Sequence, residues 1–307
     1  MRGYETAMLG RVALLLILSS VLFIGPQVAY LEQEQNVIKS VKVKEVPFKD
    51  VSSSIWKNAP VSQVNVMPQN MTPPLLQTPS IKEITVRSVH NGEWIAFLLE
   101  WEDETRDAAV DVDKFTDQVA IQIPLTPKNL PAFMMGNKGG RVHIIHWKAI
   151  WQDDIEKGYR DVQVLHPNYW VDLYFFSDKP PIYAEGEFPL QPTTVDYFIT
   201  PEALNFIPGA YARNPISMLH RTQPVEEAIA EGFGTFTTQP KQNAIGWGKW
   251  ENGLWKVIIA RPLITDDPND ASIWEESYIA FAVWNGSDKN VGARKHYAPW
   301  VKLVVEK

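Results

Sequence analysis

"IKEITVRSVHNGEWIAFLLEW", residues 81–101, decides the fold class. Two runs rich in β-branched and aromatic residues flank Asn91 and Gly92, a dipeptide that tight hairpin turns favour. A second Asn-Gly pair, in "ENGLW" (251–255), also leads into an apolar run through a tryptophan. Both segments therefore predict antiparallel hairpins.

Similar apolar segments, separated by turns with Pro, Asp or Asn-Gly, continue along the chain. Residues 224–233 ("PVEEAIAEGF") and the stretch around 201–206 ("PEALNF") are the segments with a helical pattern, so strands do not alternate with crossover helices. We expect an all-β protein, an antiparallel β-sandwich with a few short helices in its loops. The further strands are expected in "QVNVMP", "QVAIQIPL", "RVHIIHW", "VDLYFFS", "WKVIIARPL", "YIAFAVW" and "WVKLVV".

The N-terminal segment has the pattern of an export signal. Residues 12–24 ("VALLLILSSVLFI") form an uninterrupted apolar run behind a basic start. Ala29 and Gln27 fit a cleavage site poorly, so a signal peptide and a retained hydrophobic anchor helix both stay open. We expect the protein on the extracytoplasmic side, periplasmic or at the cell surface, and membrane-anchored if the segment is retained. The expected organisation is signal peptide or anchor (1–31), linker (32–44) and β-sandwich domain (45–307).

Composition excludes several classes of function. The chain has 36 acidic and 29 basic residues, a formal net charge of −7, which disfavours binding to nucleic acid. It has no cysteine, which excludes disulfides, zinc-thiolate sites, iron–sulfur clusters held by this chain and covalently attached haem. No phosphate-binding or serine-hydrolase motif occurs in the sequence. Any metal would therefore be held by His, Met, Lys, Tyr or carboxylates.

The histidines of "HIIHW" do not predict a zinc site. His143 and His146 are three residues apart, and this odd spacing in a strand places their side chains on opposite faces. We expect one to be buried with a hydrogen bond and the other to be exposed. The acidic pairs in "WQDD" and "TDDPNDA" are expected to be solvated turn residues.

A methionine before a glycine is the more informative feature. Met135 and Gly136, in "PAFMMG", follow an expected strand segment, and the thioether is a soft ligand for haem iron. A glycine lets the backbone approach a flat macrocycle. Taken alone, the methionine favours ordinary core packing, because a methionine in a β-rich core is far more often a packing residue than a ligand.

Five segments together resemble one protein family. In chain order they are "PAFMMGNKGGRVHIIHWKA", "ARNP", "EGFGTFTTQP", "GWGKWENGLWKVIIARPL" and "IAFAVWNGSDKNVGARKHYAPWVKL". Over about residues 45–305 the chain resembles the haem b-binding γ subunits of type II DMSO-reductase-family molybdoenzymes. This group includes the γ chains of ethylbenzene and dimethylsulfide dehydrogenases, of selenate and chlorate reductases, and of nitrate reductases and nitrite oxidoreductases.

The resemblance implies one non-covalent b-type haem between an axial methionine and an axial lysine. The Phe-x-Met-Gly pattern of the family maps to Met135, with Met134 as the alternative ligand. The Gly-x-x-Lys pattern maps to Lys295, followed by Trp300. His296, next to the lysine, departs from the family and is a competing ligand.

Arg213 and Asn214, in "ARNP", are the candidates to bind the haem propionates. Two strong axial ligands leave no open position on the iron, so the haem would carry electrons and the chain would have no catalytic residues of its own.

The implied partners are an iron–sulfur β subunit, a molybdopterin catalytic α subunit and a cytochrome or quinone-linked electron partner. The substrate of the catalytic subunit stays open, with a nitrate or nitrite system preferred. The alternative function is an exported carbohydrate-binding β-sandwich module, which the 12 tryptophans would suit. A stand-alone enzyme is disfavoured because the sequence has no evident nucleophile.

Overall fold

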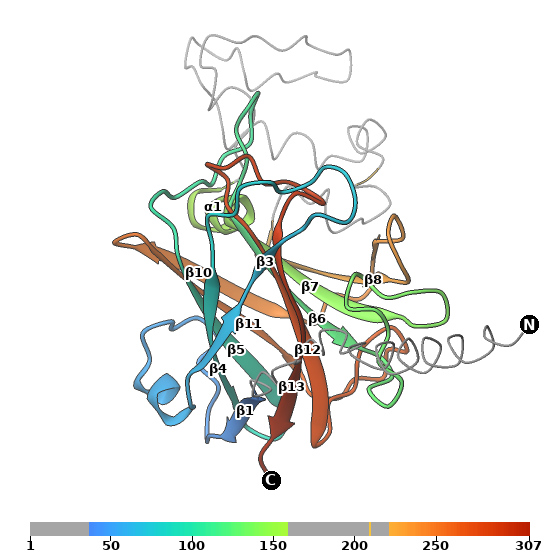
Figure 1. Ribbon diagram of the computed structural model, residues 1–307. Coiled ribbons are helices and arrows are strands. Elements are labelled where there is room, and N and C mark those ends of the chain that lie inside the picture. Colours follow the sequence, from blue (N-terminus) through green and yellow to red (C-terminus); the bar gives the residue numbers. More distant parts are fainter. Residues whose placement is uncertain (1–36, 159–208, 210–220) are drawn as a thin grey trace, which may run out of the picture. The chain divides into compact units, whose positions relative to one another are not determined.

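The computed structural model describes residues 37–158, 209 and 221–307, in which strands make up most of the regular secondary structure (Figure 1). The described helices are one α-helix, α1 (Ala149–Lys157), and one 3₁₀-helix, η1 (Ser54–Asn58). The strands are β1 (Val37–Lys42), β2 (Ser62–Asn65), β3 (Met67–Pro68), β4 (Glu83–His90), β5 (Trp94–Glu102), β6 (Gln118–Pro124), β7 (Val142–Lys148), β8 (Val225–Ala230), β9 (Thr237–Thr238), β10 (Ile245–Glu251), β11 (Leu254–Pro262), β12 (Glu276–Trp284) and β13 (His296–Val305).

The strands form one continuous sheet. Their order is β10-β11-β5-β4-β1-β13-β12-β6-β7-β8-β9, with β2 on β4 and β3 on β13. Neighbours are antiparallel except at β1, which pairs parallel with both β13 and β4. The sheet curls on itself, and its main core joins Phe97 and Trp255 from one half to Ile121 and Trp147 from the other (Figure 1). The all-β prediction is confirmed, whereas a sandwich of two separate sheets is not observed among these strands.

Both predicted hairpins are confirmed. The β10–β11 turn has Asn252 at φ 53° and Gly253 at φ 77°, and the flanking Glu251 and Leu254 pair directly. Positive φ at both central residues is what a two-residue turn requires to follow the twist of its strands. In the β4–β5 turn, the Asn91 side chain accepts hydrogen bonds from the backbone N–H groups at the start of β5.

Every predicted strand segment within the described residues lies on a strand, and three other predictions need correction. Residues 224–233 are not helical but contain β8, because pairing with β7 and β9 outweighs the helix propensity of its Ala and Glu residues. The expected linker, 32–44, contributes β1 to the middle of the sheet. Conversely, α1 forms in a segment for which no helix was predicted. The predicted strand 171–177, the stretch 201–206 and the N-terminal segment 1–31 lie outside the described residues.

None of the helices that the structure describes is long and apolar enough to span a membrane. The unit from Asn36 to Lys307 forms one compact body, and all sites below belong to it.

Candidate functional site

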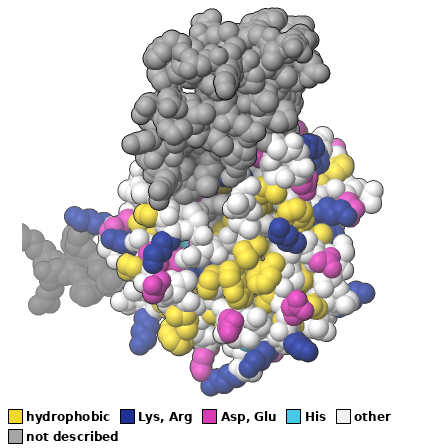
Figure 2. Space-filling model, turned by 180° about the vertical axis from the view of Figure 1, so that it is seen from behind, with side chains coloured by type: hydrophobic (Ala, Val, Ile, Leu, Met, Phe, Trp, Pro, Cys, Tyr) yellow, Lys and Arg dark blue, Asp and Glu magenta, His cyan; other side chains and the backbone are white. Residues whose placement is uncertain are grey.

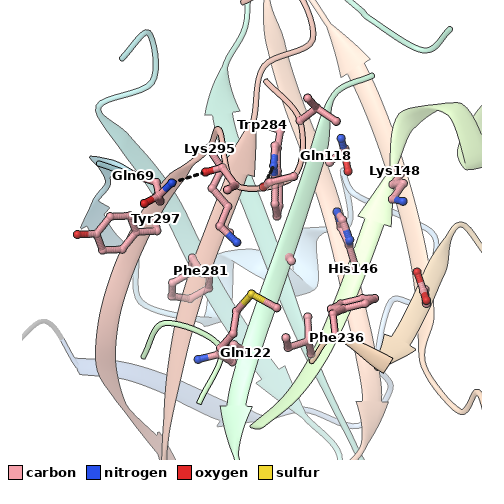
Figure 3. Close-up of a pocket in the computed structure, with 18 of the residues that line it drawn as sticks. Gln69, Gln118, Gln122, His146, Lys148, Phe236, Phe281, Trp284, Lys295 and Tyr297 are labelled. Carbon is pink, nitrogen blue, oxygen red and sulfur yellow. Dashed lines mark hydrogen bonds between the residues drawn. The ribbon is translucent and has the colours of Figure 1, made fainter. Parts of the chain in front are cut away.

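A large, mainly apolar cavity of about 900 Å³ lies against the face of the sheet formed by β6, β7 and β12. Five loop segments complete its wall, around residues 69–73, 110–116, 133–135, 233–236 and 291–295. Figure 3 shows Lys295 and Tyr297 on one side and His146 and Lys148 on the other. Its volume and apolar lining suit a cofactor-sized ligand.

Met134 and Met135 both line this cavity. They lie in a turn, so the alternation of a strand does not place their side chains on opposite sides of a sheet. Met135 has φ 64° and Gly136 φ 77°, and a Cβ on Gly136 would overlap the carbonyl oxygen of Gly140. The Gly232 N–H donates to the Met135 carbonyl at 2.8 Å. Glycine is therefore required after the methionine, and the backbone of Met135 is fixed.

Lys295, the residue just before β13, reaches the same cavity. Its backbone is held by the Gln69 N–H, which donates to the Lys295 carbonyl at 2.9 Å. Its ammonium nitrogen lies 5.0 Å from the ring centroid of Trp284. Within the described ranges, this nitrogen has no hydrogen bond or ion pair. Burial lowers the pKa of Lys295 to about 8, so the neutral amine, the form that binds a metal, is accessible near neutral pH.

His296, the competing ligand, is excluded by its position. Its side chain is fully buried on the face of β13 away from the cavity. The Nε2 atom accepts from the N–H groups of Ser80 and Ile81 at 3.1 and 3.2 Å, and Nδ1 lies 3.4 Å from the carbonyl oxygen of Val283. Neither ring nitrogen is left to bind a metal in the cavity.

The prediction that His143 and His146 face opposite sides of β7 is confirmed, but the second histidine is not exposed to bulk solvent. His146 lines the cavity and stacks on Trp284 at 4.8 Å between ring centroids. Its Nε2 has no hydrogen-bond partner in the part of the chain that the structure describes. Burial lowers its pKa well below 6.5, so the ring is neutral.

His143 belongs instead to a buried ion network on the core side of β7. Its Nε2 lies 3.2 Å from Glu227 Oε1 and 3.7 Å from Asp270 Oδ1, and Arg261 Nη2 lies 3.9 Å from Asp270 Oδ2. All four residues are at most 7% exposed. We call His143, Glu227, Arg261 and Asp270 the buried ion network below.

Lys148 and Arg221 form a cationic pair beside the cavity. The Lys148 nitrogen lies 4.2 Å, and the Arg221 guanidinium carbon 4.1 Å, from the ring centroid of Trp151. Burial lowers the pKa of both groups. Lys148 and Trp151 line the cavity. The predicted propionate-binding residues Arg213 and Asn214 lie outside the described residues.

Sequence reasoning missed three cavity residues, namely His146, Lys148 and Trp284. The alternation along β7 could have located the first two, because Ile144, His146 and Lys148 share one face of the strand. The sequence does not show that this face of β7 is the one that lines the cavity, because the cavity forms only when distant strands pair.

Comparison with known proteins assigns the family. The ethylbenzene dehydrogenase family matches residues 53–296, most of the chain. The chain belongs to this family. It is 22% identical, over 86% of its length and 70% of the relative, to a Haloferax mediterranei protein named "Putative respiratory nitrate reductase heme subunit ORF7". It is 25% identical to the chlorate reductase subunit gamma of Ideonella dechloratans, over 38% of this chain and half of that protein.

The family resemblance stated from sequence motifs is thereby confirmed. Among solved structures, a family 9 carbohydrate-binding module from Caldicellulosiruptor kristjanssonii, in complex with glucose, is similar with a TM-score of 0.38 and 9% identity. The similarity covers 88% of this chain and 95% of that one. Agreement this low supports no inference about function.

Proposed function

We propose that this member of the ethylbenzene dehydrogenase family is an electron-transfer subunit that carries one non-covalent b-type haem in the cavity. The observation that carries the proposal is that Met135 and Lys295, far apart in sequence, line the same apolar cavity. Lys295 is the stronger indication, because a buried amine without a partner is costly unless a ligand occupies it.

The residues fit a haem. The mainly apolar lining would cover the ring, while Met135 would supply a thioether and Lys295 a neutral amine to the iron. When bound, the haem would supply one-electron transfer, and with both axial positions filled it would not bind substrate. Met134, which lines the same cavity, is the alternative to Met135.

Lys148 and Arg221 would hold the propionates. Both cations flank Trp151 at the cavity wall, and carboxylates form strong, charge-assisted hydrogen bonds with such cations. Arg221 also lies 4.0 Å from Asp154, so a propionate would share the guanidinium with that carboxylate. Substitution of Lys148 is therefore the clearer test of propionate binding.

The chain would act in a complex, because a single haem has no second redox centre to pass electrons to. The names of the relatives favour an iron–sulfur subunit and a molybdenum-bearing catalytic subunit as partners, and a respiratory system as context. Which substrate the catalytic subunit turns over follows from that subunit. The apolar run of residues 12–24 favours a location outside the cytoplasmic membrane.

A haem-reconstitution experiment on the full chain tests the proposal. Haem should bind in a 1:1 ratio, be extracted by acid acetone, and give a six-coordinate low-spin spectrum. Lys148→Met should weaken the binding of haem much more than the binding of haem dimethyl ester, which has no propionate charge. Absence of haem binding by the wild-type chain would contradict the proposed function.

The sugar-binding alternative explains less of the cavity. It would use exposed aromatic rings, of which Trp274 is the most exposed in the described chain, but Trp274 does not line the cavity. It gives no role to the amine of Lys295.

A further inference from the structure

Two clusters of acidic residues in the described chain bring potential ligand atoms within 4.8 Å of one another. One consists of His143, Glu227 and Asp270, which belong to the buried ion network, and the other of Asp103, Asp107 and Asp117. We call the second the aspartate cluster. The two clusters differ in whether a cationic side chain of the protein lies beside their carboxylates.

The buried ion network supplies its own. Arg261 contributes a permanent cation beside Asp270. His143 Nδ1 accepts a hydrogen bond from the Ala271 N–H at 3.4 Å, so a neutral ring carries its proton on Nε2, which faces both carboxylates. A metal would need the lone pair of that nitrogen. The network therefore contains its own cation, although five of its buried polar atoms, including His143 Nε2, Glu227 Oε1 and Asp270 Oδ1, form no hydrogen bond in the described chain.

The aspartate cluster has no such countercharge. Asp103 follows β5, Asp107 lies in the same loop, and Asp117 comes just before β6. Arg106, the cation next in sequence, forms an ion pair with Asp153 on α1 instead. In the ranges 37–158 and 221–307, no Lys, Arg or His forms an ion pair with any of the three aspartates.

One oxygen of the cluster is left without a partner. Asp103 is 3% exposed; the Thr105 N–H donates to its Oδ1, while its Oδ2, near the indole N–H of Trp101, forms no hydrogen bond within the described residues. Asp117, fully buried, accepts from the Asp107 N–H, the Trp255 indole N–H and the Gly286 N–H at 2.7–2.9 Å. Bringing three carboxylates together, two of them buried, is costly unless a cation neutralises them.

The electrostatics agree with this geometry. Burial, and then the charge of the neighbouring aspartates, raises the pKa of Asp103 to about 6 and that of Asp117 to about 7. Without a bound cation, the cluster would be partly protonated at neutral pH.

We infer that Asp103, Asp107 and Asp117 bind one hard divalent cation, with Ca²⁺ as the best match. The cluster offers oxygen donors and no nitrogen or sulfur donor, which disfavours zinc and copper. Ca²⁺ accepts carboxylates in irregular arrangements together with water, and Asp107 is partly exposed, so water can complete the shell.

This site would stiffen two walls of the haem cavity without contacting a haem. The loop that carries Asp103 and Asp107 continues to Phe115 and Thr116, which line the cavity. Asp117 holds Gly286, at the start of the loop that leads to Lys295. Binding of the cation would therefore favour the arrangement in which the cavity is formed, and it is independent of the proposed haem.

Terbium luminescence on the full chain, stripped with a chelator, provides the test. Tb³⁺ replaces Ca²⁺ at oxygen sites, and the indole of Trp255, bonded to Asp117, would sensitise its emission. We expect emission on tryptophan excitation that Ca²⁺ abolishes. Asp103→Asn should weaken binding by at least about tenfold. Loss of a residue that only hydrogen-bonds to a metal ligand already costs about 10- to 100-fold in metal affinity.

The matched control is Asp113→Asn in the same loop, whose side chain is 66% exposed and paired with Lys289. It should bind Tb³⁺ as the wild type does. If Asp103→Asn does not fold, Asp107→Asn at the partly exposed position takes its place. Ca²⁺ should also raise the melting temperature of the wild type and not that of the variant.

Two results would overturn the inference. One is the absence of Tb³⁺ emission that Ca²⁺ competes for. The other is unchanged binding in Asp103→Asn and Asp107→Asn together with loss of binding in Glu227→Gln, which would place the site in the buried ion network.

Discussion

The two faces of β7 handle buried polar groups in opposite ways. On the core face, His143 lies beside the carboxylates of Glu227 and Asp270, and Arg261 provides a cation 3.9 Å from Asp270. On the cavity face, His146 Nε2 has no partner within the described residues, and the same is true of the Lys295 amine. Buried groups that lie beside opposite charges help to hold the fold together, whereas polar groups with no such neighbour around an apolar cavity indicate a ligand.

The cavity is also bordered by apolar side chains that are exposed to solvent. Met71, Val110, Phe233, Phe236 and Val291 line the cavity and are at least 40% exposed. Figure 2 shows hydrophobic side chains gathered on one face of the described surface. Exposed apolar side chains of this kind accompany ligand or partner sites more often than plain surface.

The largest effect is expected from breaking the buried ion network. Arg261→Met removes the permanent cation beside Asp270 and leaves buried carboxylates uncompensated, which should lower the free energy of unfolding by about 3–5 kcal/mol. Denaturant unfolding of the haem-free chain measures it. The same substitution at Arg141, half exposed and paired with Glu231, should cost less than about 1 kcal/mol. Equal losses for the two variants would remove the contrast between network and surface pairs.

The next effect concerns pH and the aspartate cluster. Because the pKa values of Asp103 and Asp117 are raised to about 6 and about 7, the folded chain binds more protons than the unfolded chain between about pH 4 and pH 7. The contribution of these groups to stability is therefore present at low pH and lost as pH rises through that range, by at most about 1.4 kcal/mol per pH unit for each proton. Unfolding of chelator-treated chain at several pH values should show this decline, and Asp103→Asn should reduce it. A decline of the same steepness in the variant would argue against the assignment.

A smaller effect separates the two histidines of β7. His146→Phe keeps the stacking on Trp284 and removes no hydrogen bond within the described chain, so stability should change by less than about 1.5 kcal/mol. His143→Phe should cost more, because it leaves the Ala271 N–H and both network carboxylates without the ring. Comparable melting temperatures for the two variants would contradict the difference between the faces.

The smallest effect on stability is expected at the haem ligand. Lys295→Met removes an amine that forms no ion pair or hydrogen bond in the described residues, so the haem-free chain should keep or gain stability, within about 1 kcal/mol. Thermal unfolding without haem provides the measurement. A large loss would mean that the amine has a structural partner.

The sequence predicted the hairpins and strands better than the way in which the strands join into one curled sheet. Asn252-Gly253 and the apolar alternation were sufficient for the hairpins and for the strands on either side of them. The location of β1 between β4 and β13 was not predictable, because its parallel partners lie at the two ends of the domain. The helical pattern of residues 224–233 misled because propensity is weaker than strand pairing.

The candidate site was predicted in part. Met135 and Lys295 came from motif resemblance, and their convergence on one cavity depends on the folded sheet. Whether His296 competes could be decided only from its backbone hydrogen bonds. The aspartate cluster joins the end of β5 to the start of β6, and nothing in the sequence indicates that its carboxylates lack a cation.

Haem binding by matched variants of the full chain tests the central claim most directly. Reconstituted wild type should give a six-coordinate low-spin spectrum with one extractable haem per chain. Met135→Leu should keep the fold, since Met-to-Leu exchanges in a core cost less than about 1.5 kcal/mol, but lose that spectrum, and Lys295→Met should lose it as well. His146→Phe is the control that should retain it. An unchanged low-spin spectrum in both ligand variants, or its loss only in His146→Phe, would contradict the account.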